Sequence, residues 1–370
     1  MGVLRFIRLS RLGYLSALLF AFAASAGAQV LSEAQAPSPP APTAQAPAAA
    51  PAPAPTSTRV KFSLDGRIEG PSAPFLLPLE RGYFKAAGLD VTIDEATTPI
   101  EAVTRVASGT YDMGFADINA MIKYRDQNPA APLKAVFMVY NTPPYAIVAR
   151  KSRGITEPRQ LEGKKLGAPP NGSTVGEWPL FAKLNGIDAS KVTIENIAIP
   201  VRAPMLAAGQ LDAVLGFSFR IYVDLKDRGV PVDDIVLLTM ADYGLKLYGS
   251  TIIVNQKFAA EKPEAVKAFL RAYLRGLKET VRRPADAIQF VVKRDDAMRK
   301  EVELERLRMA IRDNIVTPEV KAEGYGTVEM ARLEDAIGQL ALTYTFKAKP
   351  KGEDVFDGSF LPPLDERKLN

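Results

Sequence analysis

The polar residues best suited to bind a small molecule gather in the segment Pro170-Asn-Gly-Ser-Thr174. Asn171, Ser173 and Thr174 carry side-chain donors and acceptors, and they precede a predicted helix whose first backbone N–H groups lack intrahelical partners. This combination suits a carboxylate, a sulfonate or the carbonyl edge of a ring. A plain helix cap by Ser173 is the alternative interpretation, and both roles are compatible.

A second group of candidates follows the first predicted strand, in Asp65-Gly-Arg-Ile-Glu-Gly-Pro-Ser72. The glycines of this segment let the backbone approach a ligand closely. Ser72 stands at the start of a predicted helix, where its donors suit an anionic group. Arg67 is placed to pair with the same anion, although an exposed loop charge explains it equally well.

Asp117 and Asn119 follow a short apolar run, and Tyr145 follows Asn141-Thr-Pro-Pro144. Asp117 is positioned to cap the next helix, which explains it without a ligand. An ionised Asp in a cleft would instead favour a donor-bearing ligand, such as an amine or a heterocycle, with Asn119 within reach. We expect Tyr145 either to stack on a flat ligand or to pack at a hinge.

Aromatic residues follow a later apolar run, in Phe217-Ser-Phe219. Phe217 fits a core position, so Ser218 and Phe219 are the expected ligand contacts. Asp242, in Asp-Tyr-Gly244, is expected at the rim of the site.

The composition excludes several kinds of catalysis, because the 370-residue chain has no His and no Cys. It therefore has no Cys nucleophile, no Ser-His-Asp triad and no His/Cys metal cluster. Gly163-Lys-Lys165 lacks the spaced glycine of a P-loop. Paired carboxylates are not excluded, but no pattern indicates a pair. We expect a non-enzymatic binding protein without a cofactor or a bound metal.

The segments that carry these candidates recur because the chain contains an internal duplication. "ASGTYDMGF" (107–115) and "AAGQLDAVLGF" (207–217) have the same order of features. Gly209 lies 100 residues after Gly109, and an Asp follows each glycine at the same distance. Each glycine stands where a helix must end in the left-handed conformation.

Extended outward, each half has the order strand, loop, helix, strand, helix, strand. Such alternation is typical of βαβ units and a parallel sheet. The predicted fold class is α/β with two lobes, each a mostly parallel sheet flanked by helices. Because ligands bind outside the carboxyl ends of parallel strands, the ligand cleft is expected between the lobes.

The expected organisation assigns residues 59–149 to lobe I, 150–248 to lobe II, and 249–370 to a return to lobe I with C-terminal helices. The β-rich runs Tyr145–Ala149 and Tyr248–Val254 are the expected crossings between lobes. The alternating charges of 299–312 are typical of a solvated helix face.

Several sequence segments are similar to those of a known family. They are "APFLLPLERGYFKAAGLDV" (73–91), "GTYDMGFADINAM" (109–121), "LEGKKLGAPPNGST" (161–174), "AAGQLDAVLGF" (207–217) and "FLPPL" (360–364). They resemble the periplasmic substrate-binding proteins of the nitrate/sulfonate/taurine (SsuA) and Thi5-like (NMT1) group. The resemblance covers nearly everything after residue 59. It implies a type II periplasmic-binding fold that closes on a small-molecule ligand and delivers it to an ABC permease in the inner membrane.

The same group includes an enzyme branch that makes the thiamin pyrimidine by consuming its own histidine, with iron near a cysteine-rich motif. The lack of His and Cys opposes that activity here. The ligand stays open among nitrate, sulfonates or taurine, aromatic carboxylates and pyrimidines, with a flat or carboxylate-bearing molecule preferred. A periplasmic sensory binding protein is a further alternative.

The first residues have the pattern of an export signal. Arg5, Arg8 and Arg11 precede the apolar run 12–24, and Ala26-Gly-Ala28 fits the cleavage pattern, so residues 1–28 are the expected signal peptide. An uncleaved membrane anchor is the alternative. Residues 29–58 form a Pro/Ala-rich linker. We expect a periplasmic protein that is not a lipoprotein, because no Cys is available for lipid attachment.

The charge balance gives no indication of nucleic-acid binding. The formal net charge is +5 and falls by three when the signal peptide is removed. No stripe of Lys and Arg interleaved with aromatic residues is present. We expect a monomer.

Overall fold

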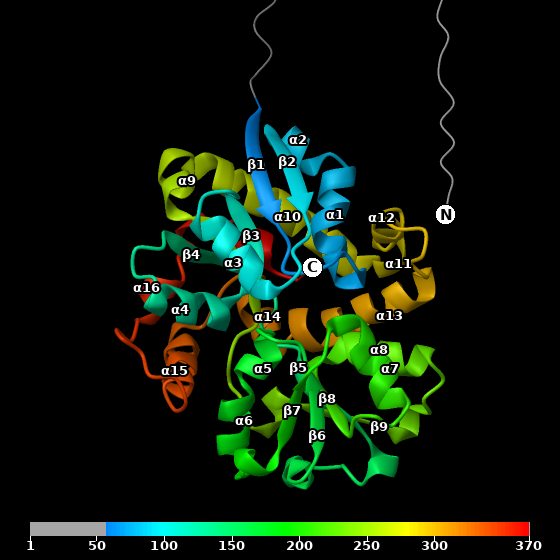
Figure 1. The fold of residues 1–370 in the computed structure, drawn as a ribbon. Coiled ribbons are helices and arrows are strands. Elements are labelled where there is room, and N and C mark those ends of the chain that lie inside the picture. The colour runs from blue at the N-terminus through cyan, green and yellow to red at the C-terminus, as the bar shows by residue number, and fades with distance from the viewer. Residues whose placement is uncertain (1–56, 370) are drawn as a thin grey trace, which may run out of the picture. The chain divides into compact units, whose positions relative to one another are not determined.

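A computed structural model describes residues 57–369, which contain two five-stranded sheets (Figure 1). The expected signal peptide and nearly all of the expected linker lie outside the described residues. The first sheet comprises β1 (Thr58–Ser63), β2 (Leu89–Asp94), β3 (Met113–Asp117), β4 (Leu133–Met138) and β10 (Ser250–Asn255). The second comprises β5 (Tyr145–Arg150), β6 (Lys165–Ala168), β7 (Thr193–Asn196), β8 (Ala213–Phe217) and β9 (Ile235–Thr239).

The two sheets have the same strand order. The first has the order β2-β1-β3-β10-β4 and the second β7-β6-β8-β5-β9. In each sheet the fourth strand in this order is antiparallel to both neighbours, whereas the first three strands pair in parallel. The predicted α/β fold of two lobes is therefore confirmed, with one antiparallel strand in each mixed sheet.

The antiparallel strands are the two that change lobe. β5 follows β4 of the first sheet but pairs with β8 and β9 of the second. β10 follows β9 of the second sheet but pairs with β3 and β4 of the first. The chain thus leaves lobe I before Tyr145, a few residues ahead of the boundary expected at 150. An apolar run indicates a buried strand, but only its pairing decides which sheet it joins.

The duplicated segments, 107–115 and 207–217, make the same backbone connection in the two lobes. Gly109 and Gly209 have φ values of 77° and 72° and follow helices α3 (Pro99–Ala107) and α7 (Ile199–Ala207). The next aspartate, Asp112 or Asp212, accepts a hydrogen bond from the backbone N–H of a residue in the neighbouring strand. The donor is Lys61 at 2.8 Å in lobe I and Lys165 at 2.9 Å in lobe II.

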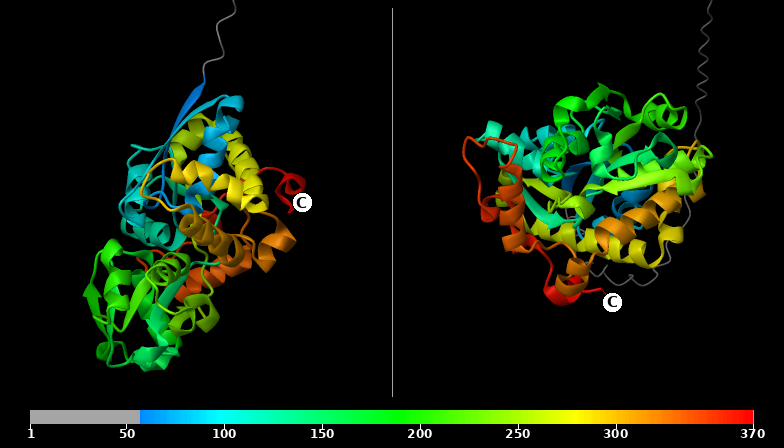
Figure 2. Two further views of the ribbon diagram at one scale, coloured as in Figure 1. Left: turned by 90° about the vertical axis from the view of Figure 1, so that its right-hand side faces the viewer. Right: turned by 90° about the horizontal axis from the view of Figure 1, so that it is seen from below.

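Helices cover both faces of each sheet (Figures 1 and 2). Besides α3, the first part of the chain in lobe I carries α1 (Ala73–Glu80), α2 (Tyr83–Ala86) and α4 (Ile118–Gln127). Besides α7, lobe II carries α5 (Ser173–Gly176), α6 (Trp178–Leu184) and α8 (Ser218–Asp227). The later helices are α9 (Gln256–Glu261), α10 (Pro263–Arg282), α11 (Pro284–Ala287), α12 (Gln289–Val292), α13 (Lys300–Ala310), α14 (Pro318–Glu323), α15 (Met330–Leu340), α16 (Gly352–Val355) and α17 (Leu364–Arg367).

The core of lobe I is rich in aromatic side chains. Phe62 of β1 stacks on Phe269 of α10 with ring centroids 5.2 Å apart, and Phe75 of α1 lies 4.7 Å from Tyr273. Gly276 lets α10 approach α1 closely, because a Cβ at this position would lie 2.6 Å from Cδ of Pro78.

Helix α13 connects the two lobes. It packs against α8 of lobe II and against the short helix Gly70–Ser72 of lobe I. A Cβ on Gly70 would overlap the backbone carbonyl of Glu303, so only a glycine permits this approach. Figure 1 shows α13 between the two lobes, beside α8.

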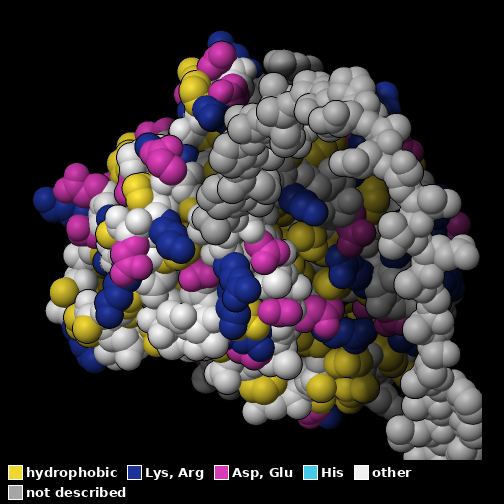
Figure 3. All heavy atoms as spheres, turned by 90° about the horizontal axis from the view of Figure 1, so that it is seen from above, with side chains coloured by type: hydrophobic (Ala, Val, Ile, Leu, Met, Phe, Trp, Pro, Cys, Tyr) yellow, Lys and Arg dark blue, Asp and Glu magenta, His cyan; other side chains and the backbone are white. Residues whose placement is uncertain are grey.

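Within residues 57–369, none of the helices combines the length and the apolar character needed to cross a bilayer. The face seen in Figure 3 carries Lys and Arg side chains intermixed with Asp and Glu over its described part. This mixture is the pattern of an ordinary solvated surface.

Candidate ligand-binding site

A cavity of about 670 Å³ lies between the lobes. Its walls follow the carboxyl ends of parallel strands, where ligands bind in open α/β sheets. Lobe I contributes the segments after β1 and β2, at 65–69 and 97–98, and lobe II those after β6, β7 and β8. Residues 295–306, around the start of α13, close a further side. The volume is in the range of small-molecule sites.

Asp65 forms part of the lobe I wall. Burial raises its pKa from 3.8 to about 7, and Arg220 opposes that rise. The negative charges of Glu69 and Asp117 add to it. Ser250 Oγ donates a hydrogen bond to Asp65 Oδ2 at 3.3 Å. Because this pKa is close to neutral pH, the Asp65 carboxyl group can accept a hydrogen bond in its ionised form and donate one in its protonated form.

An ion pair crosses from one lobe to the other beside Asp65. Arg220 of α8 donates from Nε to Glu69 Oε2 at 3.1 Å, and a second contact joins Arg220 Nη2 to Glu69 Oε1. Although burial disfavours the charged guanidinium, the carboxylate of Glu69 holds the pKa of Arg220 above its ordinary value. Arg220 also lies over the ring of Phe217, 5.6 Å from its centroid.

A second charged group links α13 to both lobes. Arg306 of α13 pairs with Asp224 of α8 and with Glu303 on its own helix. Glu303 Oε2 in turn accepts a hydrogen bond from the backbone N–H of Gly70 in lobe I at 2.6 Å. Residues 299–312 therefore do not form a purely solvated face, since Glu303 is buried and Arg306 mostly so.

The lobe II wall carries a buried arginine. Arg202 of α7 is 2% exposed, and its Nη1 donates to the backbone carbonyl of Leu215. Its Nε has no hydrogen-bond partner among the described residues. Burial lowers the pKa of Arg202 to about 10, and repulsion by the positive charge of Arg220 contributes to this decrease. Ser173 Oγ, on the same wall, is also buried without a partner among residues 57–369.

Aromatic rings form a smaller hollow that shares wall residues with the cavity. It is lined by Phe75, Phe115, Tyr140, Phe217 and Phe219. Phe217 and Phe219 lie edge to face with ring centroids 5.7 Å apart. The hollow itself is closed by buried core rings, and Phe217 is the aromatic residue that lines both the hollow and the main cavity. The main cavity therefore has one aromatic side chain next to charged and hydroxyl groups.

Five of the residues expected to contact a ligand lie at these walls. Arg67, Ser173 and Thr174 line the main cavity, and Ser72 and Phe219 line the smaller hollow. These residues come from both lobes. Asn171, Ser218 and Asp242 do not line either one. Asn171 has the left-handed φ of 59°, and Ser218 donates its N–H to Pro144 O at 2.8 Å.

Asp117, Asn119 and Tyr145 are together but away from the cavity lining. Tyr145 Oη donates to Asp117 and accepts from Asn119 Nδ2 at 3.1 Å. Asn119 Nδ2 also donates to Tyr248 O at 2.8 Å, and Asp117 accepts from Ala120 N at 2.9 Å as a helix cap. The cluster thus ties the helix after β3 to both segments that cross between lobes.

Several wall residues lay outside the candidate segments of the sequence, namely Arg202, Arg220, Glu303 and Arg306. Asp65 and Glu69 fall within the candidate segment 65–72, but only Arg67 and Ser72 were singled out there. One signal was available for Arg202, because it is the single charge in the apolar stretch Ile199-Pro-Val-Arg-Ala-Pro-Met-Leu206. Arg306 and Glu303 carried none, since their alternating pattern is that of an exposed helix.

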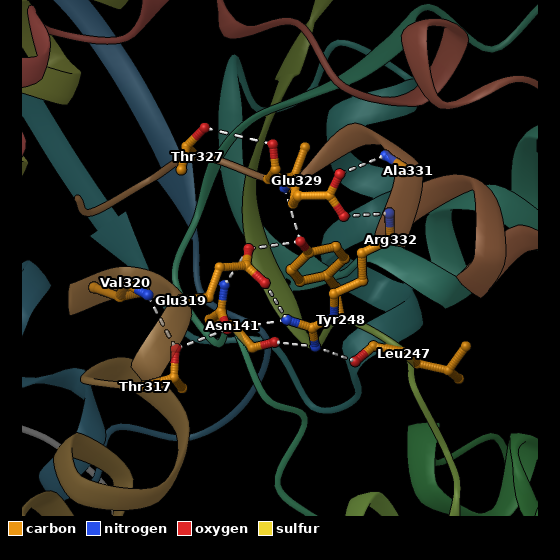
Figure 4. A network of polar contacts seen from close by, with 11 residues as sticks. Asn141, Leu247, Tyr248, Thr317, Glu319, Val320, Thr327, Glu329, Ala331 and Arg332 are labelled. Carbon is orange, nitrogen blue, oxygen red and sulfur yellow. Dashed lines mark hydrogen bonds and ion pairs between the residues drawn. The ribbon is translucent and has the colours of Figure 1, made fainter. Parts of the chain in front are cut away.

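The two crossing segments are held by one arginine from α15 (Figure 4). Arg332 Nη2 donates to Asn141 O at 2.8 Å in the first crossing and to Leu247 O at 3.1 Å in the second. Its Nη1 pairs with Glu319 Oε2 at 2.6 Å, and its guanidinium lies 3.9 Å from the ring centroid of Tyr248. Tyr248 Oη donates to Glu319 Oε1 at 2.6 Å.

This network, defined as Asn141, Tyr248, Glu319 and Arg332, is called the hinge clamp below. Hydrogen bonds to Glu319 from Tyr248 and Arg332 hold the pKa of that carboxylate below its usual value despite its burial. Within residues 57–369, no group of three or more acidic residues is arranged to hold a metal ion.

The family model described as "NMT1/THI5 like" matches residues 71–287. The riboflavin-binding protein RibY of Chloroflexus aurantiacus is 28% identical over 59% of this chain and 62% of its own length. The 4-amino-5-hydroxymethyl-2-methylpyrimidine phosphate synthase of Aspergillus parasiticus is 29% identical over 60% of this chain and 66% of its own. The chain thus spans less than two thirds of these relatives.

Solved structures agree on the fold. The periplasmic aliphatic sulphonate binding protein SsuA of Escherichia coli superimposes with a TM-score of 0.62. It covers 86% of this chain and 93% of its own, at 13% sequence identity. At that identity the likeness concerns the two-lobed architecture alone.

Proposed function

Because the chain belongs to the NMT1/THI5-like family and has the fold of periplasmic binding proteins, we propose that it is the solute-binding component of an ABC importer. It captures a small organic molecule between its two lobes by hinge closure. A permease in the inner membrane then receives the molecule. The sequence pattern of residues 1–28 supports export to the periplasm, where we propose that the protein acts as a monomer.

The cavity walled by both lobes is the observation that carries this proposal. A ligand there contacts groups from the segments after β1 and after β6 at the same time. Its binding energy is available only when the lobes are close, so it shifts the equilibrium toward closure. The permease then recognises the closed form of the protein.

The walls favour a flat organic ligand over a small inorganic ion such as nitrate. A cavity of about 670 Å³, lined in part by Phe217, is larger than a nitrate ion requires. Relatives named for riboflavin and for a pyrimidine support a heteroaromatic ring. We assign Arg67, Ser173 and Thr174 as ligand contacts, with Asp65 on the opposite wall from Ser173. Phe217 replaces the expected Phe219 as the aromatic contact, because Phe217 lines the cavity whereas Phe219 is 1% exposed in the core.

A pyrimidine synthase is the second candidate, because relatives with that name match the chain at comparable identity. The lack of His and Cys opposes it, since an enzyme of the Thi5 type consumes a histidine. We therefore favour binding without bond formation. Mass spectrometry of the intact chain after incubation with iron tests this choice, and any loss of mass from a side chain would contradict it.

A thermal-shift screen of heteroaromatic compounds tests the proposal. A ligand at 100 times its dissociation constant stabilises the folded protein by about 2.7 kcal/mol. Ala198→Trp places a large ring on the cavity wall from an exposed position and should abolish the shift. Ala189→Trp, exposed and outside the cavity lining, is the matched control. Equal shifts in both variants would contradict the assignment of the cavity.

A further inference from the structure

Arg202 differs from the other buried arginines that line the cavity. Arg220 pairs with Glu69, and Arg306 pairs with Asp224 and Glu303. None of the ion pairs among residues 57–369 includes Arg202, although it is 2% exposed. A buried charge without a partner is costly, and a protein keeps one mainly where a ligand supplies the partner.

The surroundings of Arg202 are built to keep it in place. Gly216, at the end of β8, leaves the space that its guanidinium occupies, because a Cβ there would overlap Arg202 Nη1. Leu215 O accepts from Nη1 and fixes the orientation of the guanidinium, while Nε stays free among the described residues. The burial that lowers the pKa of Arg202 leaves it cationic at neutral pH, at about 10.

A second free donor lies on the same wall. Ser173 Oγ is buried and has no partner within the described chain, and both Ser173 and Arg202 line the cavity. Helices α5 and α7, which carry them, both pack on β8. The nearest carboxylates do not satisfy Arg202, since Asp224 is paired with Arg306 and Glu69 with Arg220.

We propose that Arg202 and Ser173 form an oxyanion subsite in lobe II, so that the captured molecule carries a carboxylate, sulfonate or phosphate group. Charge-assisted hydrogen bonds from an arginine and a hydroxyl are the usual means of binding such groups. This inference rests on the proposed function, because it concerns the ligand of the same cavity. It adds an anionic group to the flat ring and names the residues that select for it.

Thermal-shift titrations with acetate, methanesulfonate and inorganic phosphate test this subsite, each at constant ionic strength set with sodium chloride. The wild-type chain should show a saturable rise in Tm with at least one of the three anions, and the anion that acts identifies the group. Arg202→Met should weaken that anion about ten- to a hundredfold, or about 1.4–2.8 kcal/mol. Arg228→Met, at an exposed position outside the cavity lining, should behave as wild type.

A purely structural role for Arg202 gives different results. With chloride alone, Arg202→Met should unfold at the wild-type temperature or above, since it removes an uncompensated buried charge. If it unfolds well below, and the anion affects both proteins equally, the subsite is refuted. If Arg202→Met does not fold, Ser173→Ala replaces it, and an unchanged anion affinity in that variant refutes the subsite.

The result is distinguishable from failure of the proposed function. No saturable effect of any of the three anions on wild type would refute the subsite, even if a neutral ring compound still closed the lobes. Conversely, anion binding at Arg202 without closure by any compound would leave the subsite intact and remove the transport role.

Discussion

Arg220 in lobe II and Glu69 in lobe I form an ion pair across the ligand cavity, with Arg220 Nε 3.1 Å from Glu69 Oε2. Both side chains are mostly buried, at 19% and 15% exposure. The pair links the wall of one lobe directly to that of the other, beside Asp65. In the proposed closure, the lobes would therefore bring together opposite charges as well as the ligand contacts.

Arg220→Met is expected to favour the open arrangement of the lobes. It leaves Glu69 without its partner in a poorly solvated site, which costs about 3 kcal/mol in the closed state. Ligand affinity should fall, with little change in the unfolding temperature measured without ligand. Combining it with Glu69→Gln should restore part of the affinity, because the unpaired charge is gone. Additive losses in the double variant would show that the pair does not couple the lobes.

Arg332→Met should weaken the hinge clamp. It removes charge-assisted hydrogen bonds to Asn141 O, Leu247 O and Glu319, each of which contributes about 1–3 kcal/mol. The free energy of unfolding in urea should fall by about 2–4 kcal/mol. Arg312→Met is the matched control, since Arg312 is largely exposed and pairs only with its neighbour Asp313. Equal losses in both variants would contradict a special role for Arg332.

The fold could be predicted from the sequence to a large extent, because its signals are local. The helix-ending glycines and the matched aspartates mark the same turn in each half. The sheet joined by Tyr145–Arg150 could not be predicted, since it depends on a pairing with strands that come later in the chain.

The candidate site was less accessible to sequence reasoning. Loop residues such as Ser173 and Thr174 carry recognisable cap chemistry, whereas Glu303 and Arg306 reach the cavity only because α13 lies between the lobes. Asp117 and Tyr145 each had two interpretations in the sequence, a ligand contact and a structural role, and in the structure they are hydrogen-bonded to each other at the crossing strands. Polar residue type alone does not distinguish a ligand contact from a support for the hinge.

Asp65→Asn should change how stability depends on pH. The folded-state pKa of Asp65 is raised to about 7, in surroundings that include Arg220, Glu69 and Asp117. Between about pH 4 and 7 the folded chain holds a proton that the unfolded chain has lost, so wild-type stability falls as pH rises through this window. The variant should lack this fall and be the more stable protein at pH 8. Identical pH profiles of Tm would contradict the raised pKa.

Asp112→Ala and Asp212→Ala should have matching effects. Each removes one hydrogen bond to a backbone N–H in the neighbouring strand, from Lys61 or from Lys165. Each should lower the free energy of unfolding by about 1 kcal/mol. The double variant should show the sum, because the two sites lie in different sheets. A decrease in the free energy of unfolding in only one of the two single variants would show that the two aspartates do not contribute equally to the stability of their lobes.

Small-angle X-ray scattering with and without a compound that raises Tm tests the central claim most directly. If the lobes close on the ligand, the radius of gyration should decrease on binding in wild type, and should not decrease in Ala198→Trp with its blocked cavity. An unchanged radius of gyration for every compound that binds would contradict capture between the lobes.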